Sequence, residues 1–236
     1  MNPATRTKAA YALLFLVAAW GCLWNLDSRR IWGDEAETAL LAVNITQFGV
    51  PRTQDGRNEI TNLPDRQDAN EDGIWTWSPW LDEYITATSF LVLGPTTTAA
   101  RLPFAILGLL SVVLLGRVAF RTYRSHSVAL VAMTLYVTCV PFLMHARQAR
   151  YYALALLAQI WLLHAVARSV REPGLRTTLH VAVPLAILFY SNYVLVLAPA
   201  LAIAAFGLFQ RHKSPETFRC LALAGVLLLA AARISV

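Results

Sequence analysis

The sequence predicts an all-α protein that crosses a membrane several times, and three observations lead to this fold class. Of the 236 residues, 57% are hydrophobic and only 14% are charged, which is far too apolar for a soluble domain. About seven apolar stretches reach or approach the roughly twenty residues that a bilayer-spanning helix needs. The Lys and Arg residues lie in the connections between these stretches rather than in one patch, which argues against nucleic-acid binding despite the net charge of +6.

The first apolar stretch has the length of a membrane span rather than of a cleavable signal peptide. It follows Arg6 and Lys8, and Trp20 is unsuited to a cleavage site ahead of Cys22. We therefore expect an uncut first helix. The full set of expected spans is 9–26, 102–120, 127–144, 151–170, 178–190, 194–209 and 219–232.

The fifth, sixth and seventh stretches are shorter than a full span. Three explanations remain open: the helices are tilted, buried between other helices, or interrupted at Ser191-Asn192.

The distribution of charge predicts which connections lie on which side of the membrane. Most Lys and Arg residues fall at the N-terminus and in alternate connections, which we expect in the cytoplasm. The opposite connections are residues 27–100, the turn near 145–150 and residues 190–193. Twelve of the fourteen acidic residues lie in 27–100. We therefore expect an integral protein of the cell (inner) membrane whose long first loop faces the periplasm or the cell exterior.

This long loop is expected to contain two helices that lie on the membrane surface. The first begins with Asp34 as the N-cap and Glu37 completing a capping box, and ends at Gly49 and Pro51.

The second surface helix takes Ser78 as its N-cap and Pro79 at its first position, and stops at Gly94. Between the two helices, residues 53–73 are polar and rich in Gly, Asn and Asp, as in a series of turns or a mobile segment.

Two places in these outer connections carry charged residues that are candidates for catalysis or substrate binding. Asp34 and Glu35 lie at a membrane edge, where the simpler interpretation is a helix cap and a favourable contact with the helix dipole. Arg147 and Arg150 lie in a very short outer turn, against the usual bias of basic residues. They are either anchors whose heads reach the interface or an anion site, since Arg binds phosphate with paired hydrogen bonds.

Taken in order, several short motifs form a constellation. They are Asp34-Glu35, Gly49-Val50-Pro51, Asp55-Gly56, Ser78-Pro79-Trp80, Ala100-Arg101-Leu102-Pro103 and the run from Arg147 to Tyr152. This ordered set resembles the GT-C glycosyltransferases of the protein O-mannosyltransferase and lipid A aminoarabinose transferase superfamily. The resemblance covers residues 1–236 as one GT-C-like membrane domain. It matches the N-terminal module of these proteins, so we expect a truncated form of a longer protein.

The resemblance implies an inverting transfer of sugar from a polyisoprenyl-phosphate donor to a lipid, glycan or protein acceptor on the outer face of the membrane. Asp34 is then the candidate general base, and Glu35 orients the acceptor. Arg150, with Arg147 as the second choice, stabilises the leaving phosphate, and Tyr151 lines the donor path. The resemblance implies no definite cofactor, and a divalent metal is the one candidate.

One alternative role for Glu35 is a divalent metal site shared with His145. One carboxylate and one His make an incomplete set of ligands for such an ion.

Two other classes of function are weighed against the enzyme. A transporter places ionisable groups near the middle of the membrane, whereas the expected spans are almost free of acidic residues. A non-catalytic membrane module that binds a lipid-linked sugar or a partner is the stronger alternative. In every case the surrounding membrane lipids are partners.

Overall fold

The computed structural model describes residues 2–61, 63, 65 and 67–233. These residues form helices joined by turns and a few isolated bridges, and the described part contains no strand, so the predicted all-α fold class is confirmed. The chain divides into two compact units, Met1–Ala153 (unit 1) and Leu154–Val236 (unit 2). That residues 1–236 form one domain stays a prediction.

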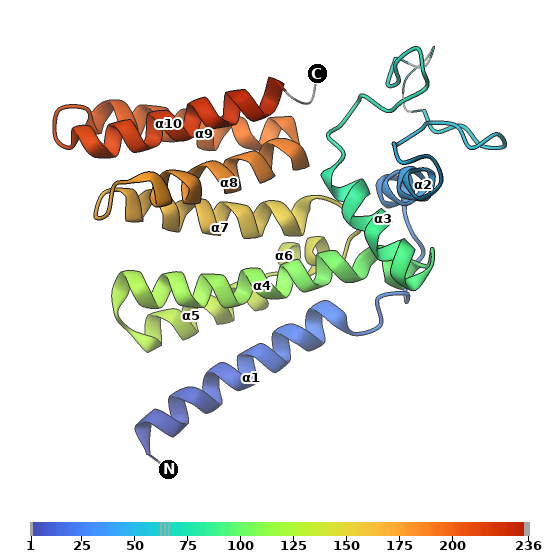
Figure 1. The fold of residues 1–236 in the computed structure, drawn as a ribbon. Coiled ribbons are helices and arrows are strands. Elements are labelled where there is room, and N and C mark those ends of the chain that lie inside the picture. The colour runs from blue at the N-terminus through green and yellow to red at the C-terminus, as the bar shows by residue number, and fades with distance from the viewer. Residues whose placement is uncertain (1, 62, 64, 66, 234–236) are drawn as a thin grey trace. The chain divides into compact units, whose positions relative to one another are not determined.

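Unit 1 contains the first six helices, and within it α2 and α3 lie at one end of α1, α4 and α5 (Figure 1). Their bounds are α1 (Pro3–Leu23), α2 (Gly33–Phe48), α3 (Leu81–Leu93), α4 (Thr97–Tyr123), α5 (His126–Val137) and α6 (Val140–Ala146). Helix α7 (Tyr152–Ser169) begins at the boundary between the units. Unit 2 continues with α8 (Leu175–Ser191), α9 (Tyr193–Gln210) and α10 (Pro215–Ala232).

Every predicted apolar stretch is helical, but fewer than seven helices qualify as membrane spans. In the described residues five helices are long and apolar enough, namely α1, α4, α7, α9 and α10. The stretch predicted at 127–144 is two helices, α5 and α6, bent by 68° and counting as a sixth span at most. Pro141 explains the break, because it lacks the N–H that a helix continued from α5 would need there and its ring would clash with a carbonyl one turn earlier, whereas the start of a new helix tolerates it. Helix α8 is apolar but shorter than the other spans.

Small residues allow the helices of unit 1 to approach closely. A Cβ atom added to Gly108 of α4 would lie 2.7 Å from the Cβ of Ala146 at the end of α6. A Cβ on Gly116 would clash with the sulfur of Met133 in α5. Helix α4 therefore packs against both halves of the bent pair through glycines.

The first surface helix begins differently from the prediction. Helix α2 starts at Gly33 with Trp32 as its N-cap, and no side chain caps it. The predicted capping box of Asp34 and Glu37 is therefore wrong. Trp32 already has the extended backbone of an N-cap, which moves Asp34 into the first turn, where a carboxylate still interacts favourably with the helix dipole. The predicted end is correct, since Gly49 adopts the left-handed conformation with φ of 78°.

The second surface helix also starts later than predicted. Helix α3 begins at Leu81 with Trp80 as its N-cap, while the Ser78 hydroxyl accepts a hydrogen bond from the Trp75 indole at 2.8 Å. Because Ser78 is used in this way, it does not cap the helix. Gly94 ends α3 as predicted.

The segment between these helices is folded rather than extended. Antiparallel bridges pair Arg52 with Ile74 and Ala69 with Trp75, and Trp75 is fully buried. Together these contacts bring the chain back to the start of α3.

The core of unit 1 near these surface helices joins α2, α3, α4 and the start of α7. Its buried residues are Ala42, Ile45, Ala87, Phe90, Ala99, Ala100, Phe104, Ala149 and Ala153. In unit 2 a separate apolar core is formed by α7 to α10.

Candidate active site

A buried ion pair joins the start of α2 to the start of α4. The Arg101 guanidinium donates from Nε to Glu35 Oε1 at 2.8 Å and from Nη2 to Glu35 Oε2 at 2.6 Å. The two side chains are 7% and 1% exposed. This paired geometry is the strongest form of an Arg–carboxylate contact.

The same ion pair fixes two further segments of unit 1. Arg101 donates to the backbone carbonyls of Leu26 at 2.6 Å, Arg29 at 2.9 Å and Arg30 at 3.3 Å. Glu35 Oε1 accepts the backbone N–H of Ala149 at 2.9 Å. The connection after α1, the helices α2 and α4, and the turn before α7 therefore meet at one point.

From the sequence, Arg101 was one residue of a motif and had no predicted role. Its signal was present, since an Arg in the first turns of an apolar span needs an anionic or carbonyl partner.

Arg150 binds the first turns of α2. Its Nη1 is 2.9 Å from Glu37 Oε1 and 3.2 Å from the Thr38 hydroxyl. It also donates to the Asp34 carbonyl at 3.3 Å, and Nη2 lies 4.0 Å from Asp34 Oδ2. The Arg150 side chain is 12% exposed, whereas the Asp34 side chain is 47% exposed. Asp34 is thus the accessible carboxylate of this group.

Tyr151 and His145 complete the sequence-predicted set. The Arg150 guanidinium lies 5.5 Å from the centre of the Tyr151 ring, and burial is the main reason that the pKa of Tyr151 rises to about 12. His145 Nδ1 is 3.3 Å from Gln148 Oε1, and its ring packs on Tyr152. Glu35 is engaged elsewhere, by Arg101. No group of three or more His, Cys, Asp and Glu residues in the described ranges is arranged to hold a metal ion.

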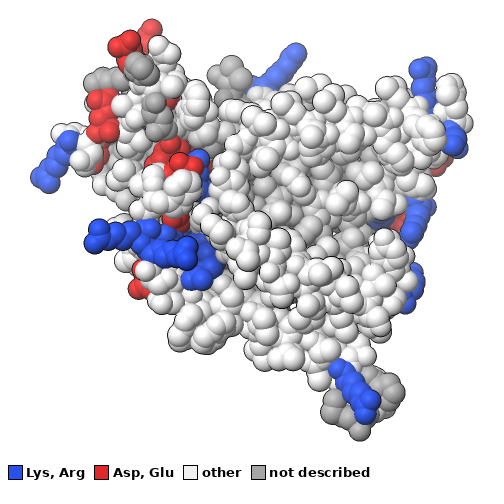
Figure 2. Space-filling view, turned by 180° about the vertical axis from the view of Figure 1, so that it is seen from behind, with Lys and Arg blue, Asp and Glu red and all other residues white. Residues whose placement is uncertain are grey.

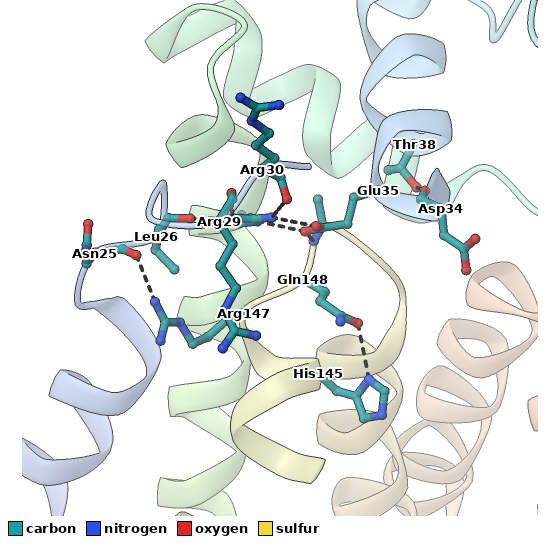
Figure 3. Close-up of polar contacts among 12 residues, drawn as sticks. Asn25, Leu26, Arg29, Arg30, Asp34, Glu35, Thr38, His145, Arg147 and Gln148 are labelled. Atoms are coloured by element: carbon teal, nitrogen blue, oxygen red, sulfur yellow. Dashed lines mark hydrogen bonds and ion pairs between the residues drawn. The ribbon is translucent and has the colours of Figure 1, made fainter. Parts of the chain in front are cut away.

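Arg147 lines a cavity of about 710 Å³ within unit 1. Its Nη2 donates to the carbonyls of Trp24 at 2.6 Å and Asn25 at 2.9 Å, which holds the side chain at the end of α1 (Figure 3). Three exposed or partly exposed arginines, Arg29, Arg30 and Arg147, contribute to the lining of the cavity. The rest is lined by Gly21, Leu26, Ser28, Trp32, Glu35, Arg101, Val140, Leu143, Met144 and Gln148. Such a combination of charged and apolar lining residues suits an anionic amphiphile.

Two further carboxyl groups were not predicted as site residues. Asp82 and Glu83, in the first turn of α3, are 3% and 0% exposed. Burial raises the pKa of Asp82 to about 6, although the positive charge of Arg150 opposes the shift. Burial, reinforced by the charge of Asp82, raises the pKa of Glu83 well above its ordinary value. The sequence of α3 does not reveal the burial of these two acids, because adjacent acids at the start of a helix normally face water.

The acidic side chains of the visible face gather mainly in one region, beside a group of basic side chains, while most of that face carries no charge (Figure 2). This matches the twelve acidic residues between positions 27 and 100.

Comparison with known families decides the class of protein. A family model described as dolichyl-phosphate-mannose-protein mannosyltransferase matches residues 78–235, which is more than half of the chain. The chain belongs to this family. The family is of the GT-C type, so the resemblance read from the sequence is confirmed. No curated protein and no solved structure matches the chain.

Membership of the mannosyltransferase family, together with the apolar helices, makes this an integral membrane protein of the glycosyltransferase class whose donor is lipid-linked. The matched range includes Arg101, Arg147 and Arg150. It does not include Asp34 or Glu35, whose roles therefore rest on the geometry of unit 1 and on the motif itself.

Proposed function

We propose that this protein transfers a sugar from a polyisoprenyl-phosphate donor to a hydroxyl or amine acceptor on the outer face of the membrane, with inversion at the anomeric carbon. The observation that carries the proposal is the cavity of about 710 Å³ whose lining combines Arg29, Arg30 and Arg147 with apolar side chains and includes Glu35 of the Asp34-Glu35 motif. The acceptor belongs to a lipid, a glycan or a protein.

The donor phosphate binds among the arginines that line the cavity, and Arg147 is its principal ligand. Arg29 and Arg30 line the same cavity and are exposed. Arg150 is the weaker candidate for this role, because its guanidinium is already bound to Glu37 and it does not line the cavity. The apolar side chains of Val140, Leu143 and Met144 suit the isoprenoid chain of the donor.

Asp34 is the general base. Its carboxylate is half exposed at the start of α2, and neither a cap bond nor a close ion pair occupies it. It accepts the proton of the acceptor as the acceptor oxygen or nitrogen bonds to the anomeric carbon. The bond between that carbon and the phosphate oxygen breaks, and its electron pair leaves with the polyisoprenyl phosphate, whose charge Arg147 stabilises.

The remaining predicted residues, Glu35, Arg150 and Tyr151, hold the helices of the site in place and take no part in the chemical step. Glu35, held by Arg101 and Ala149, aligns α2 with the turn that carries Arg147 and Arg150. Arg150 holds the start of α2 through Glu37, and Tyr151 packs against Arg150.

The test is transfer from polyisoprenyl-phosphate mannose by the purified chain in lipid nanodiscs, read as the release of polyisoprenyl phosphate. Donor cross-linking to residues of the cavity, together with release, supports the enzyme. Cross-linking without release under any acceptor condition would favour a non-catalytic module that binds the lipid-linked sugar.

A further inference from the structure

The pair Asp82–Glu83 on α3 is a buried acidic feature that the proposed reaction leaves unused. Both side chains are almost completely buried, and neither oxygen of the Glu83 carboxyl group has a hydrogen-bond partner among the described residues. An ionised carboxylate in such surroundings is costly, whereas the neutral acid costs far less. Two adjacent buried carboxyls disfavour double ionisation further.

Charged and titratable groups of the neighbouring elements interact electrostatically with this pair. Helix α2 contributes Glu37, and the turn before α7 contributes Arg150 and Tyr151, whereas Asp34 acts on Arg150. On α3 itself, the Tyr84 hydroxyl is turned to the carbonyl of Gly49. On α4, Arg101 is occupied by Glu35.

Arg150 is therefore the cation that acts on Asp82. One face of its guanidinium is bound to α2 through Glu37, while its Nε is buried and has no hydrogen-bond partner among the described residues. Arg150 already forms an ion pair with Glu37, and a negative charge on Asp82 would attract the same guanidinium from the α3 side, because electrostatic attraction is strong in a dry site.

We propose that Asp82 and Glu83 carry one negative charge between them, on Asp82, while Glu83 keeps its proton, and that this charge holds Arg150 beside Asp34. Asp82 is thus a positioning residue for the base, acting through Arg150 and not on the substrate. This inference rests on the proposed function in which Asp34 removes the acceptor proton.

The first experiment reads the proton on Glu83 without any transfer assay. Infrared spectroscopy of the purified chain in nanodiscs at neutral pH should show the C=O stretching band of a protonated carboxyl group. The band should disappear in Glu83→Gln, and persist in Asp82→Asn and in the exposed control Glu71→Gln. Absence of the band in the wild-type protein, or its persistence in Glu83→Gln, would overturn the assignment of the proton.

The second experiment compares kcat of the wild-type protein and Asp82→Asn across pH. Displacement of catalytic groups by about 1 Å costs on the order of 100-fold, so we expect a loss of roughly 10- to 100-fold in Asp82→Asn near neutral pH. Below about pH 5, where Asp82 of the wild-type protein also takes up a proton, the two rates should converge. Glu83→Gln, which mimics the protonated acid, should follow the wild-type profile.

A loss in Asp82→Asn that is the same factor at every pH would overturn the positioning role, because a purely structural defect does not depend on the charge of Asp82. If no variant transfers sugar, the proposed function fails while the infrared bands still decide where the proton lies.

Discussion

Arg101 holds Glu35 in a buried ion pair through two hydrogen bonds of 2.8 and 2.6 Å, although the two residues are 66 positions apart in the sequence. Both carboxylate oxygens of Glu35 are thereby occupied, and one of them also accepts the Ala149 N–H. The arrangement favours Glu35 as the residue that aligns α2 with the turn before α7, and leaves Asp34 as the accessible acid of the motif.

Removing either partner of this ion pair should destabilise unit 1 strongly. Glu35→Gln or Arg101→Met leaves a buried charge without compensation, which typically costs about 3–5 kcal/mol. The double variant should lose clearly less than the sum of the two single losses, because each variant already removes the same interaction. Unfolding of the purified protein in detergent measures these losses.

The matched control for that experiment is the ion pair of Arg168 and Glu172, whose side chains are 31% and 64% exposed. Removal of Glu172 should cost only about 0–1 kcal/mol, as for most surface pairs. Equal losses at Glu35 and Glu172 would contradict the structural role assigned to Arg101.

The two arginines of the turn before α7 should affect different kinetic constants. Arg147→Lys should raise the KM for the lipid-phosphate donor, since a point charge cannot replace a planar pair of donors at phosphate. Arg150→Lys should mainly lower kcat, because it loosens the contacts with Glu37 and Thr38 that hold the start of α2. Arg168→Lys serves as the control and should change neither.

Steady-state kinetics with varied donor concentration separate these effects. A large rise in donor KM for Arg150→Lys with none for Arg147→Lys would return the phosphate site to Arg150, the first choice from the sequence.

The stability of the protein should fall as the pH rises from about 4 to beyond 6. The folded-state pKa of Asp82 is raised from 3.8 to about 6. The contribution of Asp82 to the free energy of unfolding is therefore fully present below pH 3.8 and is lost as the pH rises through about 6. A shift of this size corresponds to about 3 kcal/mol. The raised pKa of Glu83 extends the loss to higher pH.

Thermal unfolding across this pH range tests the linkage. In Asp82→Asn the loss attributable to Asp82 should disappear, while the exposed control Asp72→Asn should keep the wild-type dependence. A wild-type protein whose melting temperature rises steadily over the same range would contradict the burial of the acidic pair.

The sidedness of the long first loop is open to a direct labelling test. In a protein whose Cys22, Cys139 and Cys220 are replaced, single cysteines at Asn58 and Glu71 should react with an impermeant thiol reagent in intact cells. A cysteine at His212 should be protected until the membrane is permeabilised. This expectation follows from the bias of basic residues towards the cytoplasm, and the reverse pattern would place the proposed base on the inner face.

Local signals in the sequence were enough to predict most of the fold. Long apolar stretches dictate helices because a membrane satisfies backbone groups only in that way. Gly49 and Gly94 end the surface helices because both adopt positive φ, of 78° and 80°. The start of α2 was misplaced because Trp32 takes the N-cap without a side-chain bond. The break between α5 and α6 was missed because the stretch 127–144 was assigned from its hydropathy, which takes no account of the effect of Pro141 on a helix.

The candidate site was only partly predictable, because its decisive contacts join distant positions. The motifs identified Asp34, Glu35, Arg147 and Arg150, but nothing local shows that Glu35 binds Arg101 and that Arg150 binds Glu37. The burial of Asp82 and Glu83 depends on packing between α2 and α3, which the sequence of α3 does not reveal.

The central claim is that Asp34 is the general base, and Asp34→Asn tests it most directly. Asp34 makes no capping bond, so the substitution should lose only its dipole contact, about 0.3–1 kcal/mol, and its 4.0 Å contact with Arg150, about 0–1 kcal/mol for an exposed pair. Asn cannot accept the acceptor proton, and loss of a general base costs about 100-fold to 10,000-fold. We therefore predict that purified Asp34→Asn melts almost as the wild-type protein does and binds the donor, but transfers sugar at least about 100-fold more slowly. Wild-type rates of transfer in a normally folded Asp34→Asn protein would contradict the account.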